Sequence, residues 1–580
     1  MVDSITAEIV RGYLLSVTEE MNDIISMTAM SPVFNEGHDY STAIFAMQDR
    51  EIDLVALTIA LPEHIFASKA SVEEMMRVFG ADRWSRGDVG LVNDPYHGGS
   101  HLPDMTVAMP VFAGDRPLLF PVVRAHQLDV GGPVAAFKNV MARDIWQEGF
   151  RIYPIKVFEA GERRDDVWRM LVANTRLPTD VDNDLSAIIG ACRVASERLE
   201  ALLAKYGATA VEESLQLMLA NTERQFREHV TAWPDGEYDG VSLVDSDWAG
   251  TVDIDIRAKV TVKGDSLAVD FTGTHEQCPG IVNSPPGNSM SWVYIPFTTL
   301  FPDIPVNSGL FRAIDVVLPE GTVVNPIPPV PTGQSTTSCG ENIGDAVMKA
   351  IEKIAPERTA FCGIDLCFLY QWGIDRRYGT FYLGLDYLAS AVCAGGAYGA
   401  DGWGAYAATH SGLRLATVEV TELQYPFQYL ELDYITDSGA PGRWRGVPGC
   451  KMVRKNTEDA MGDARVNILV CGSRHPASGF AGGSAGVGNY FVIDPDTPNE
   501  TKVETFAFRV PSPPGQVVIS RKGGGGGWGN PLDRDPDAVL ADVLDEYVSI
   551  EGARRDYGVV IDPAPLAIDE AATTALRSSL

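Results

Sequence analysis

Two short segments of the sequence place a histidine three residues before an aspartate. GSHLPDMTV contains His101 and Asp104, and RAHQLDVGG contains His126 and Asp129. Imidazole nitrogens and carboxylate oxygens together suit a borderline divalent ion such as Zn²⁺, Mn²⁺ or Fe²⁺, and they suit Ca²⁺ poorly. A histidine and an aspartate also cap ordinary turns, so one pair alone leaves both interpretations open.

A third segment, NEGHDYS, adds Glu36, His38 and Asp39 ahead of another strand-like run. The chain has nine histidines, and five of them fall in its first 126 residues, at positions 38, 64, 97, 101 and 126. If the three segments lie on neighbouring strands, their polar side chains meet in one pocket, because strand ends present side chains on rigid supports. A metal site and three separately capped turns both remain open at this point.

Other segments carry weaker signals. Asp94 and His97 could hold a ligating imidazole in place or be solvated loop residues, and Cys339 has no partnered histidine in the sequence, which makes a cysteine nucleophile a weak idea. Residues 331–345, rich in hydroxyls, could hold an anion with their amides or cap a helix. The five glycines at 523–527 lack the Lys-Ser/Thr of a phosphate-binding loop, and no GxxxxGK[ST] motif occurs in the chain.

The N-terminal part has the elements needed to position these residues. A period of 3.6 residues predicts a helix over 3–28, a short helix ends at Gly80, and long helices are expected at about 182–206 and 209–231. Apolar runs bounded by Gly, Asp and Pro predict strands at 40–49, 88–94, 106–114 and 117–126. The two histidine-aspartate segments therefore sit at the ends of predicted strands.

The residue pattern of the sequence changes after about residue 232. From 237 to 330 valine, threonine and isoleucine alternate with charged residues, a helix is expected near 341–354, and strands with glycine-rich loops continue to about 520. We expect an α+β, multi-domain protein with a mixed N-terminal α/β region at 1–232 that carries the candidate metal site and a β-rich region with inserted helices at 233–520. A glycine-rich hinge or tight loop and a short helical tail are expected at 521–580.

Length and composition bound the possibilities further. At 580 residues the chain predicts two to four domains. Its net charge of −32 argues against nucleic acid or an anionic membrane surface as a partner. Eight cysteines without a CxxC pair indicate buried thiols in a reducing compartment, and the first residues lack a basic-then-apolar signal. We expect a cytoplasmic protein without a membrane span.

Six segments together resemble the hydantoinase B family. They are SPVFNEGHDYSTAIF, NDPYHGGSHLPDMTV, RAHQLDVGG, DSGAPGRWRGVPG, GGGGGWGNPLDRDP and RRDYGVVID, and their order and spacing cover nearly the whole chain. The family includes one subunit of ATP-dependent hydantoinases, the C-terminal half of 5-oxoprolinase, the smaller caprolactamase subunit, and subunits of acetone and acetophenone carboxylases.

The resemblance implies a division of labour. An actin-like partner subunit of hydantoinase A type binds ATP and phosphorylates the substrate, and the hydantoinase B-like subunit handles the activated intermediate in a hetero-oligomer. The resemblance also implies one divalent metal ion, Zn²⁺ or Mn²⁺, held by Asp39, His101, Asp104 and His126. Glu36 is the rival of Asp39 for the first position. His38 and Gln127 differ from the residues common at these positions in the family, so the resemblance does not define which side chains contact the metal ligands there.

The implied function is ATP-dependent hydrolysis of a cyclic amide: a hydantoin, oxoproline or a lactam. O-phosphorylation removes the resonance that makes an amide a poor electrophile, and a metal-bound water at near-neutral pKa can then attack. Asp129 is a candidate base for that water, or it only hydrogen-bonds the glycine turn that follows it. The alternatives are a subunit of an ATP-dependent ketone carboxylase and a metal-free scaffold for the ATPase subunit.

Overall fold

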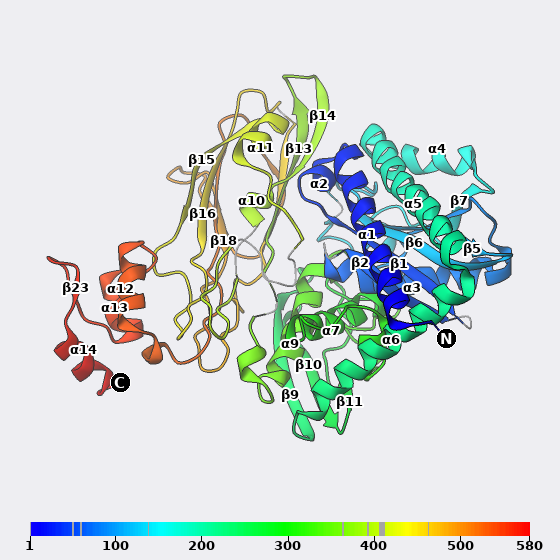
Figure 1. Ribbon diagram of the computed structural model, residues 1–580. Helices are drawn as coiled ribbons and strands as arrows, with labels where there is room; N and C mark the ends of the chain where they lie inside the picture. The colour runs from blue at the N-terminus through cyan, green and yellow to red at the C-terminus, as the bar shows by residue number, and fades with distance from the viewer. Residues whose placement is uncertain are drawn as a thin grey trace.

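The computed structural model describes the chain in nine stretches, residues 2–48, 51–58, 61–136, 138–361, 363, 365–390, 394–404, 412–461 and 463–580. Along the chain follow an N-terminal sheet with long helices, a middle part with a smaller sheet, a β-rich part and a small C-terminal unit (Figure 1). The expected multi-domain α+β fold is confirmed. The domain boundaries at 232 and 520 stay a prediction.

An eight-stranded sheet, antiparallel throughout, forms the core of the N-terminal part. Its order is β2 (Glu51–Thr58), β1 (Tyr40–Gln48), β6 (Arg116–His126), β4 (Asp104–Ala108), β3 (Val89–Val92), β7 (Ile155–Glu159) and β8 (Glu162–Arg163), with β5 (Val111–Ala113) paired to β6. The four predicted strands are present. The one expected over 106–114 is divided into β4 and β5 around Pro110, which has no N–H to donate to a ladder.

Helices cover both faces of this sheet. Thr42 of β1 donates to Thr18 O of helix α1 (Ser4–Thr28), whereas its neighbour Ser41 donates to Leu61 O at the start of α3 (Pro62–Phe79). Because successive strand residues point to opposite faces, α1 and α3 lie on opposite sides. Helix α5 (Pro178–Tyr206) packs against α1, and the next helix in the chain, α6 (Ala208–Thr231), also contacts α1.

The predicted helices over 3–28, 182–206 and 209–231 are confirmed, and the short helix ending at Gly80 is the last part of the longer α3. Gly80 ends α3 at φ 81°, a backbone angle that favours glycine. In the described ranges, no helix combines the length and the apolar character that crossing a bilayer requires.

The middle part contains the predicted strands and, besides the short α8 (Ser308–Phe311), a long helix that was not predicted. Its sheet has the order β12 (Ile314–Val317), β11 (Ser266–Asp270), β10 (Val252–Lys263) and β9 (Gly236–Ser246), and α9 (Gly340–Ile351) packs on β9 and β10. The unpredicted helix α7 (Pro286–Leu300) packs between α3 and α9. Its sequence is apolar on most sides and contains Pro296, so it shows no helical period.

Two further sheets pack face to face in the β-rich part. One has the order β14 (Thr380–Leu385), β13 (Phe368–Asp375), β17 (Arg465–Leu469) and β20 (Phe506–Pro511). The other has the order β15 (Phe427–Tyr434), β16 (Cys450–Asn456), β21 (Val517–Arg521), β18 (Tyr490–Ile493) and β19 (Thr501–Val503). Leu369 and Ile468 of the first share one core with Met452 and Phe491 of the second.

The glycine-rich segment after β21 is packed inside the β-rich part, where a hinge or tight loop was expected. Residues 523–527 are buried, and the amides of Gly525 and Gly527 donate to Val447 O and Ser484 O at 3.0 and 2.9 Å. A Cβ at position 523 would lie 1.7 Å from Val487 O, so only glycine fits. The segment leads to the C-terminal unit of α12 (Pro536–Leu544), α13 (Ile550–Tyr557) and α14 (Glu570–Arg577).

Candidate metal centre

Three strand ends meet at one edge of the N-terminal sheet. Strand β6 lies between β1 and β4, and the register sets Asp104 opposite His126. The amide of His126 donates to the backbone oxygen of Asp39, the residue before β1, at 3.0 Å. The end of β6 therefore lies between the start of β4 and the approach to β1, as expected for neighbouring strands.

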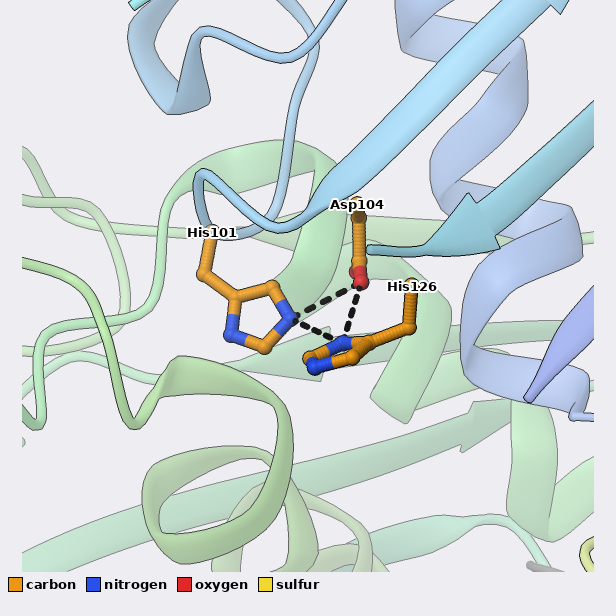
Figure 2. Close-up of side chains that lie close together, drawn as sticks. All are labelled: His101, Asp104 and His126. Atoms are coloured by element: carbon orange, nitrogen blue, oxygen red, sulfur yellow. Dashed lines mark hydrogen bonds and ion pairs between the residues drawn. The ribbon is translucent and has the colours of Figure 1, made fainter. Parts of the chain in front are cut away.

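His101, Asp104 and His126 form a compact triangle (Figure 2). His101 Nε2 lies 2.8 Å from Asp104 Oδ1, His126 Nδ1 lies 3.0 Å from the same oxygen, and the two nitrogens are 3.2 Å apart. All three side chains are almost fully buried. The structure thus brings three of the four predicted ligands to one point.

The donor set of this triangle fits a divalent ion. Nitrogen and oxygen ligands of a tetrahedral zinc lie at about 2.0–2.2 Å from the ion, and hence about 3.3 Å from one another. The observed separations of 2.8, 3.0 and 3.2 Å are slightly smaller. The side chains would have to move apart by only a few tenths of an ångström to hold an ion at their centre.

Surrounding groups orient these donor atoms. Gly333 O lies 3.2 Å from His101 Nδ1, so that nitrogen can donate to the carbonyl and leave the lone pair of Nε2 facing the triangle. Ser100 Oγ donates to Asp104 Oδ2 and accepts from Arg124 Nη2 at 2.8 Å. One oxygen of Asp104 is therefore anchored and the other is directed at the two imidazoles.

The fourth predicted ligand, Asp39, is not part of the triangle, but it lies near a histidine, His64, that the sequence analysis did not select. His64 Nε2, on the first turn of α3, lies 3.7 Å from Asp39 Oδ1 and 3.5 Å from Asp104 Oδ2. Its other nitrogen, Nδ1, is buried without a hydrogen-bond partner in the described residues. The clustering of histidines early in the chain was a signal for His64, but its place on a helix hid which face it occupies.

Burial sets the protonation of the centre. It lowers the pKa of His101 to about 4 and that of His64 to about 3, and it raises the pKa of Asp39 to about 6. Burial alone would also raise the pKa of Asp104, but the neighbouring histidines outweigh it and hold that pKa well below its ordinary value. At neutral pH His101 and His64 are therefore neutral and Asp39 and Asp104 are ionised, the forms that bind a cation.

A small cavity adjoins the triangle, between the N-terminal part and the β-rich part. It measures about 40 Å³, room for a few water molecules. Its polar lining consists of Asp39, Glu63, His64, His101, His126, Lys138, Thr336 and Thr337, together with the hydroxyl-bearing Tyr370 and Tyr387. Tyr387 donates to Asp39 Oδ2 at 3.4 Å, and most of the remaining lining is aliphatic.

Asp129, the predicted base, is not brought together with the other residues. Its Oδ1 accepts from Arg176 Nη1 at 2.8 Å, and its Oδ2 accepts from the Arg176 amide at 2.6 Å and from Thr175 Oγ1 at 3.1 Å. The carboxylate is buried and is not among the residues that line the cavity. These contacts tie it to the segment that leads into α5, and its role as a base stays a prediction.

Of the other candidates from the sequence, the hydroxyl-rich segment 331–345 contributes Thr336 and Thr337 to the cavity lining, whereas Glu36, His38, His97 and Cys339 lie outside that lining. Glu36 ends the short helix α2 (Pro32–Asn35), and His38 stacks on Tyr40 with ring centroids 5.7 Å apart. His97 Nδ1 lies 2.8 Å from Glu74 Oε1. Cys339 is buried, and burial raises the pKa of its thiol, which does not favour a nucleophile.

Comparisons with known proteins show which family the chain resembles along its length. The family model described as hydantoinase B/oxoprolinase matches residues 3–531. The chain is 34% identical to the beta subunit of caprolactamase from Pseudomonas jessenii over 589 aligned positions, covering 100% of this chain and 99% of that protein. It is 30% identical to the putative D-/L-hydantoinase B subunit of Pseudomonas sp. (strain NS671), covering 99% and 98%.

Two solved structures share the fold. The crystal structure of the ATP-dependent caprolactamase from Pseudomonas jessenii matches with a TM-score of 0.88 and 32% identity over 100% of both chains. A nucleotide-free acetone carboxylase structure matches with a TM-score of 0.86 over 100% of this chain and 83% of that chain, but at 18% identity this likeness concerns the fold alone. With a family model matching almost its whole length and relatives at 30–34% identity, the chain belongs to the hydantoinase B/oxoprolinase family.

Proposed function

We propose that this chain is the metal-dependent subunit of an ATP-dependent hydrolase of cyclic amides. Its partner in the complex would be an actin-like ATP-binding subunit of hydantoinase A type, which phosphorylates the amide oxygen of a hydantoin, oxoproline or a lactam. The observation that carries the proposal is the buried triangle of His101, Asp104 and His126 beside a cavity. Similarity to a caprolactamase subunit and a hydantoinase subunit over the full chain supports the substrate class.

The residues of the centre have separate tasks in this proposal. His101, Asp104 and His126, with Asp39 as the fourth ligand, would hold one Zn²⁺ or Mn²⁺ ion. When bound, such an ion supplies a water of near-neutral pKa and polarises the reacting carbon. Ser100 and the Gly333 carbonyl keep two of the ligands in the orientation that the ion requires.

The overall reaction is balanced by water and ATP. Transfer of the γ-phosphoryl group to the amide oxygen gives an imidate phosphate and ADP. One water adds to the activated carbon and the ring C–N bond breaks, which frees the amine and leaves an acyl phosphate. A second water hydrolyses the acyl phosphate, and the products are an open-chain amino acid derivative and inorganic phosphate. For Asp129 to accept a proton from the first water, its carboxylate would have to break its hydrogen bond with Arg176 and turn toward the cavity.

The ketone carboxylase alternative uses the same fold and the same kind of centre, with an enol phosphate and a CO₂ unit from bicarbonate as reactants. Its support here is the fold likeness to acetone carboxylase at 18% identity, which is weaker than the 34% identity to a caprolactamase subunit. A scaffold that only seats the ATPase subunit would need no stoichiometric metal. The three hypotheses therefore differ in metal content and in dependence on bicarbonate.

The test is reconstitution of the chain with a hydantoinase A-type ATPase subunit from the same organism. The complex is given ATP, Zn²⁺ or Mn²⁺, and in turn a lactam, a hydantoin, 5-oxoproline and acetone, each with and without bicarbonate. We expect ring opening of a cyclic amide without bicarbonate, coupled to release of ADP and phosphate, and no turnover with His101→Ala. Strict bicarbonate dependence with acetone would instead support the carboxylase, and a wild-type chain that never retains metal would support the scaffold.

A further inference from the structure

Asp39 is held differently from the other three predicted metal ligands. The ladder between β4 and β6 fixes Asp104 and His126, and a backbone carbonyl orients His101. Asp39 lies just before β1, and its side chain is 15% exposed. A carboxylate that can rotate loses side-chain freedom when it binds an ion, and this loss costs free energy. A group that fixes the carboxylate of Asp39 in advance therefore raises the metal affinity of the centre.

The two oxygens of Asp39 face groups from different parts of the chain. Oδ1 lies 3.7 Å from His64 Nε2, on the first turn of α3. Oδ2 accepts a hydrogen bond from the hydroxyl of Tyr387 at 3.4 Å. Tyr387 begins the short helix α10 (Tyr387–Ser390), which follows strand β14 of the β-rich part. The β-rich part therefore reaches the metal centre through this one side chain's contact with Asp39.

The ring of Tyr387 packs against the turn that carries Asp39. A Cβ added at Gly37 would lie 3.2 and 3.3 Å from Cε2 and Cζ of that ring, and 2.9 Å from Val33 O. The same Val33 oxygen accepts from the Asp39 amide at 3.0 Å, and the amide of Arg414 donates to Gly37 O at 2.8 Å. The glycine of the NEGHDYS segment thus allows the ring to approach closely, and the tyrosine is buried there.

The hydroxyl of Tyr387 adds a directional contact that the ring alone does not provide. A hydrogen bond to an ionised carboxylate is stronger than one between neutral groups. Among the described residues, no other side chain donates a hydrogen bond to the Asp39 carboxylate. Tyr387 and Asp39 both line the cavity, and two further lining residues from the β-rich part, Leu385 and Leu413, are apolar and offer no donor. The orientation of the carboxylate therefore depends on this hydroxyl.

We propose that Tyr387 is a positioning residue whose hydroxyl holds the Asp39 carboxylate in the orientation that completes the metal centre. All four ligands then lie in the N-terminal part, and the β-rich part supplies the contact that sets one of them. This inference rests on the proposed function in taking Asp39 as the fourth ligand. It concerns metal affinity and can be tested without turnover.

The first experiment titrates the metal-free full-length chain with Zn²⁺ or Mn²⁺ and measures binding by calorimetry. Tyr387→Phe keeps the ring and removes the hydroxyl, and it should lower metal affinity about tenfold. Tyr429→Phe is the matched control, because the Tyr429 hydroxyl also donates to a buried aspartate, Asp386 Oδ1 at 2.8 Å, and neither residue lines the cavity. Since Asp386 directly precedes Tyr387, this control also reports any general disturbance of the segment, and its metal affinity should equal that of wild type.

A double-mutant cycle shows whether the hydroxyl acts through Asp39. Asp39→Asn removes the anionic acceptor, so adding Tyr387→Phe to that variant should lower metal affinity no further. With Co²⁺ as the bound ion, the visible spectrum should change in the same direction in Tyr387→Phe and in Asp39→Asn, which a loss of stability alone does not produce. Equal metal affinity in wild type and Tyr387→Phe would overturn the proposal, and so would a tenfold loss that persists in the Asp39→Asn background.

The reconstituted complex separates this inference from the proposed function. Raising the metal concentration about tenfold should restore the activity of Tyr387→Phe, because a positioning residue acts on metal affinity. A fall in kcat that remains at saturating metal would place the hydroxyl in the reaction itself and overturn the positioning role. Metal affinity that depends on Tyr387 in a complex that opens no cyclic amide would support the positioning role and refute the proposed reaction.

Discussion

His126 and Asp104 face each other across the paired ends of β6 and β4, with Nδ1 of the imidazole 3.0 Å from Oδ1 of the carboxylate. Residues directly opposite in an antiparallel ladder have Cβ atoms at a distance that the sheet itself fixes. His101 has no such support, because it precedes β4 and its ring is oriented by the carbonyl of Gly333 from the middle part of the chain. The sheet therefore fixes the positions of Asp104 and His126, whereas the orientation of His101 depends on a contact with a distant segment of the chain.

Removal of the His101 imidazole should abolish metal binding. We expect His101→Ala to lower metal affinity by at least about a hundredfold, because one of the nitrogen donors of a buried set is lost, and activity should disappear with the metal. Metal analysis of the purified chain and activity of the complex are the measurements. His97→Ala is the control: His97 also contacts a carboxylate, Glu74, at 2.8 Å, but outside the triangle. Equal metal content in the two variants would contradict the site.

The choice between Asp39 and Glu36 as the acidic ligand can be decided by a pair of amide substitutions. Asp39 lines the cavity and lies 3.7 Å from His64 Nε2, whereas Glu36 is not among the lining residues. We expect Asp39→Asn to weaken metal binding by about 10–100-fold and Glu36→Gln to leave it unchanged. Titration of the metal-free chain with Zn²⁺ or Mn²⁺ measures both, and a loss confined to Glu36→Gln would reverse the assignment.

The sequence could predict those residues of the centre that are close together along the chain, but not those that come from distant segments. His126 ends one predicted strand and Asp104 lies two residues before another, so only the pairing of neighbouring strands was needed to bring them together. His64 escaped selection because it lies on the first turn of α3, and the sequence analysis expected only a short helix ending at Gly80. Gly333 and Lys138 could not be connected to the site at all, since loops far apart in the chain bring them there.

The glycine-rich segment at 523–527 shows a second reason why the sequence could not predict part of the fold. Five consecutive glycines are typical of a mobile loop when only local propensity is considered. Here the reason for glycine is space: backbone oxygens such as Val487 O approach where a Cβ would be. Close approach of distant chain segments leaves no periodic pattern in the sequence, so a packed segment and a hinge have the same local signature.

A buried carboxyl that is not among the residues lining the metal-centre cavity, Asp365, should make stability depend on pH. Burial raises the pKa of Asp365 to about 7 from an ordinary 3.8. Between those values the folded chain binds more protons than the unfolded chain, so this group's contribution to stability is present below pH 3.8 and is lost as the pH rises through 7. Asp365→Asn cannot ionise, and its Tm should exceed that of wild type by roughly 2 °C or more at pH 8.

The pH dependence of that difference is the critical measurement. Thermal unfolding at pH 5 and pH 8 should give a Tm difference between Asp365→Asn and wild type that is larger at pH 8. Asp265→Asn, at a residue whose side chain is 58% exposed, should show no such trend. A Tm difference that stays constant across this range, or shrinks toward pH 8, would mean that Asp365 does not ionise at a raised pKa.

Asp129 offers a test in which a structural role and a catalytic role predict different observables. Its two oxygens accept from the Arg176 side chain, the Arg176 amide and Thr175, so Asp129→Asn replaces an acceptor with a donor at a buried site. We expect a loss of about 1–3 kcal/mol of stability, a similar loss in Arg176→Gln, and kcat within about threefold of wild type once the variants are folded. A general base would behave otherwise: kcat would fall by about 10²–10⁴-fold with the acidic limb of the pH–rate profile lost, and Arg176→Gln would not reproduce it. Because Asp129 is not among the lining residues and both its oxygens accept hydrogen bonds from Thr175 and Arg176, the first outcome is the one the geometry favours.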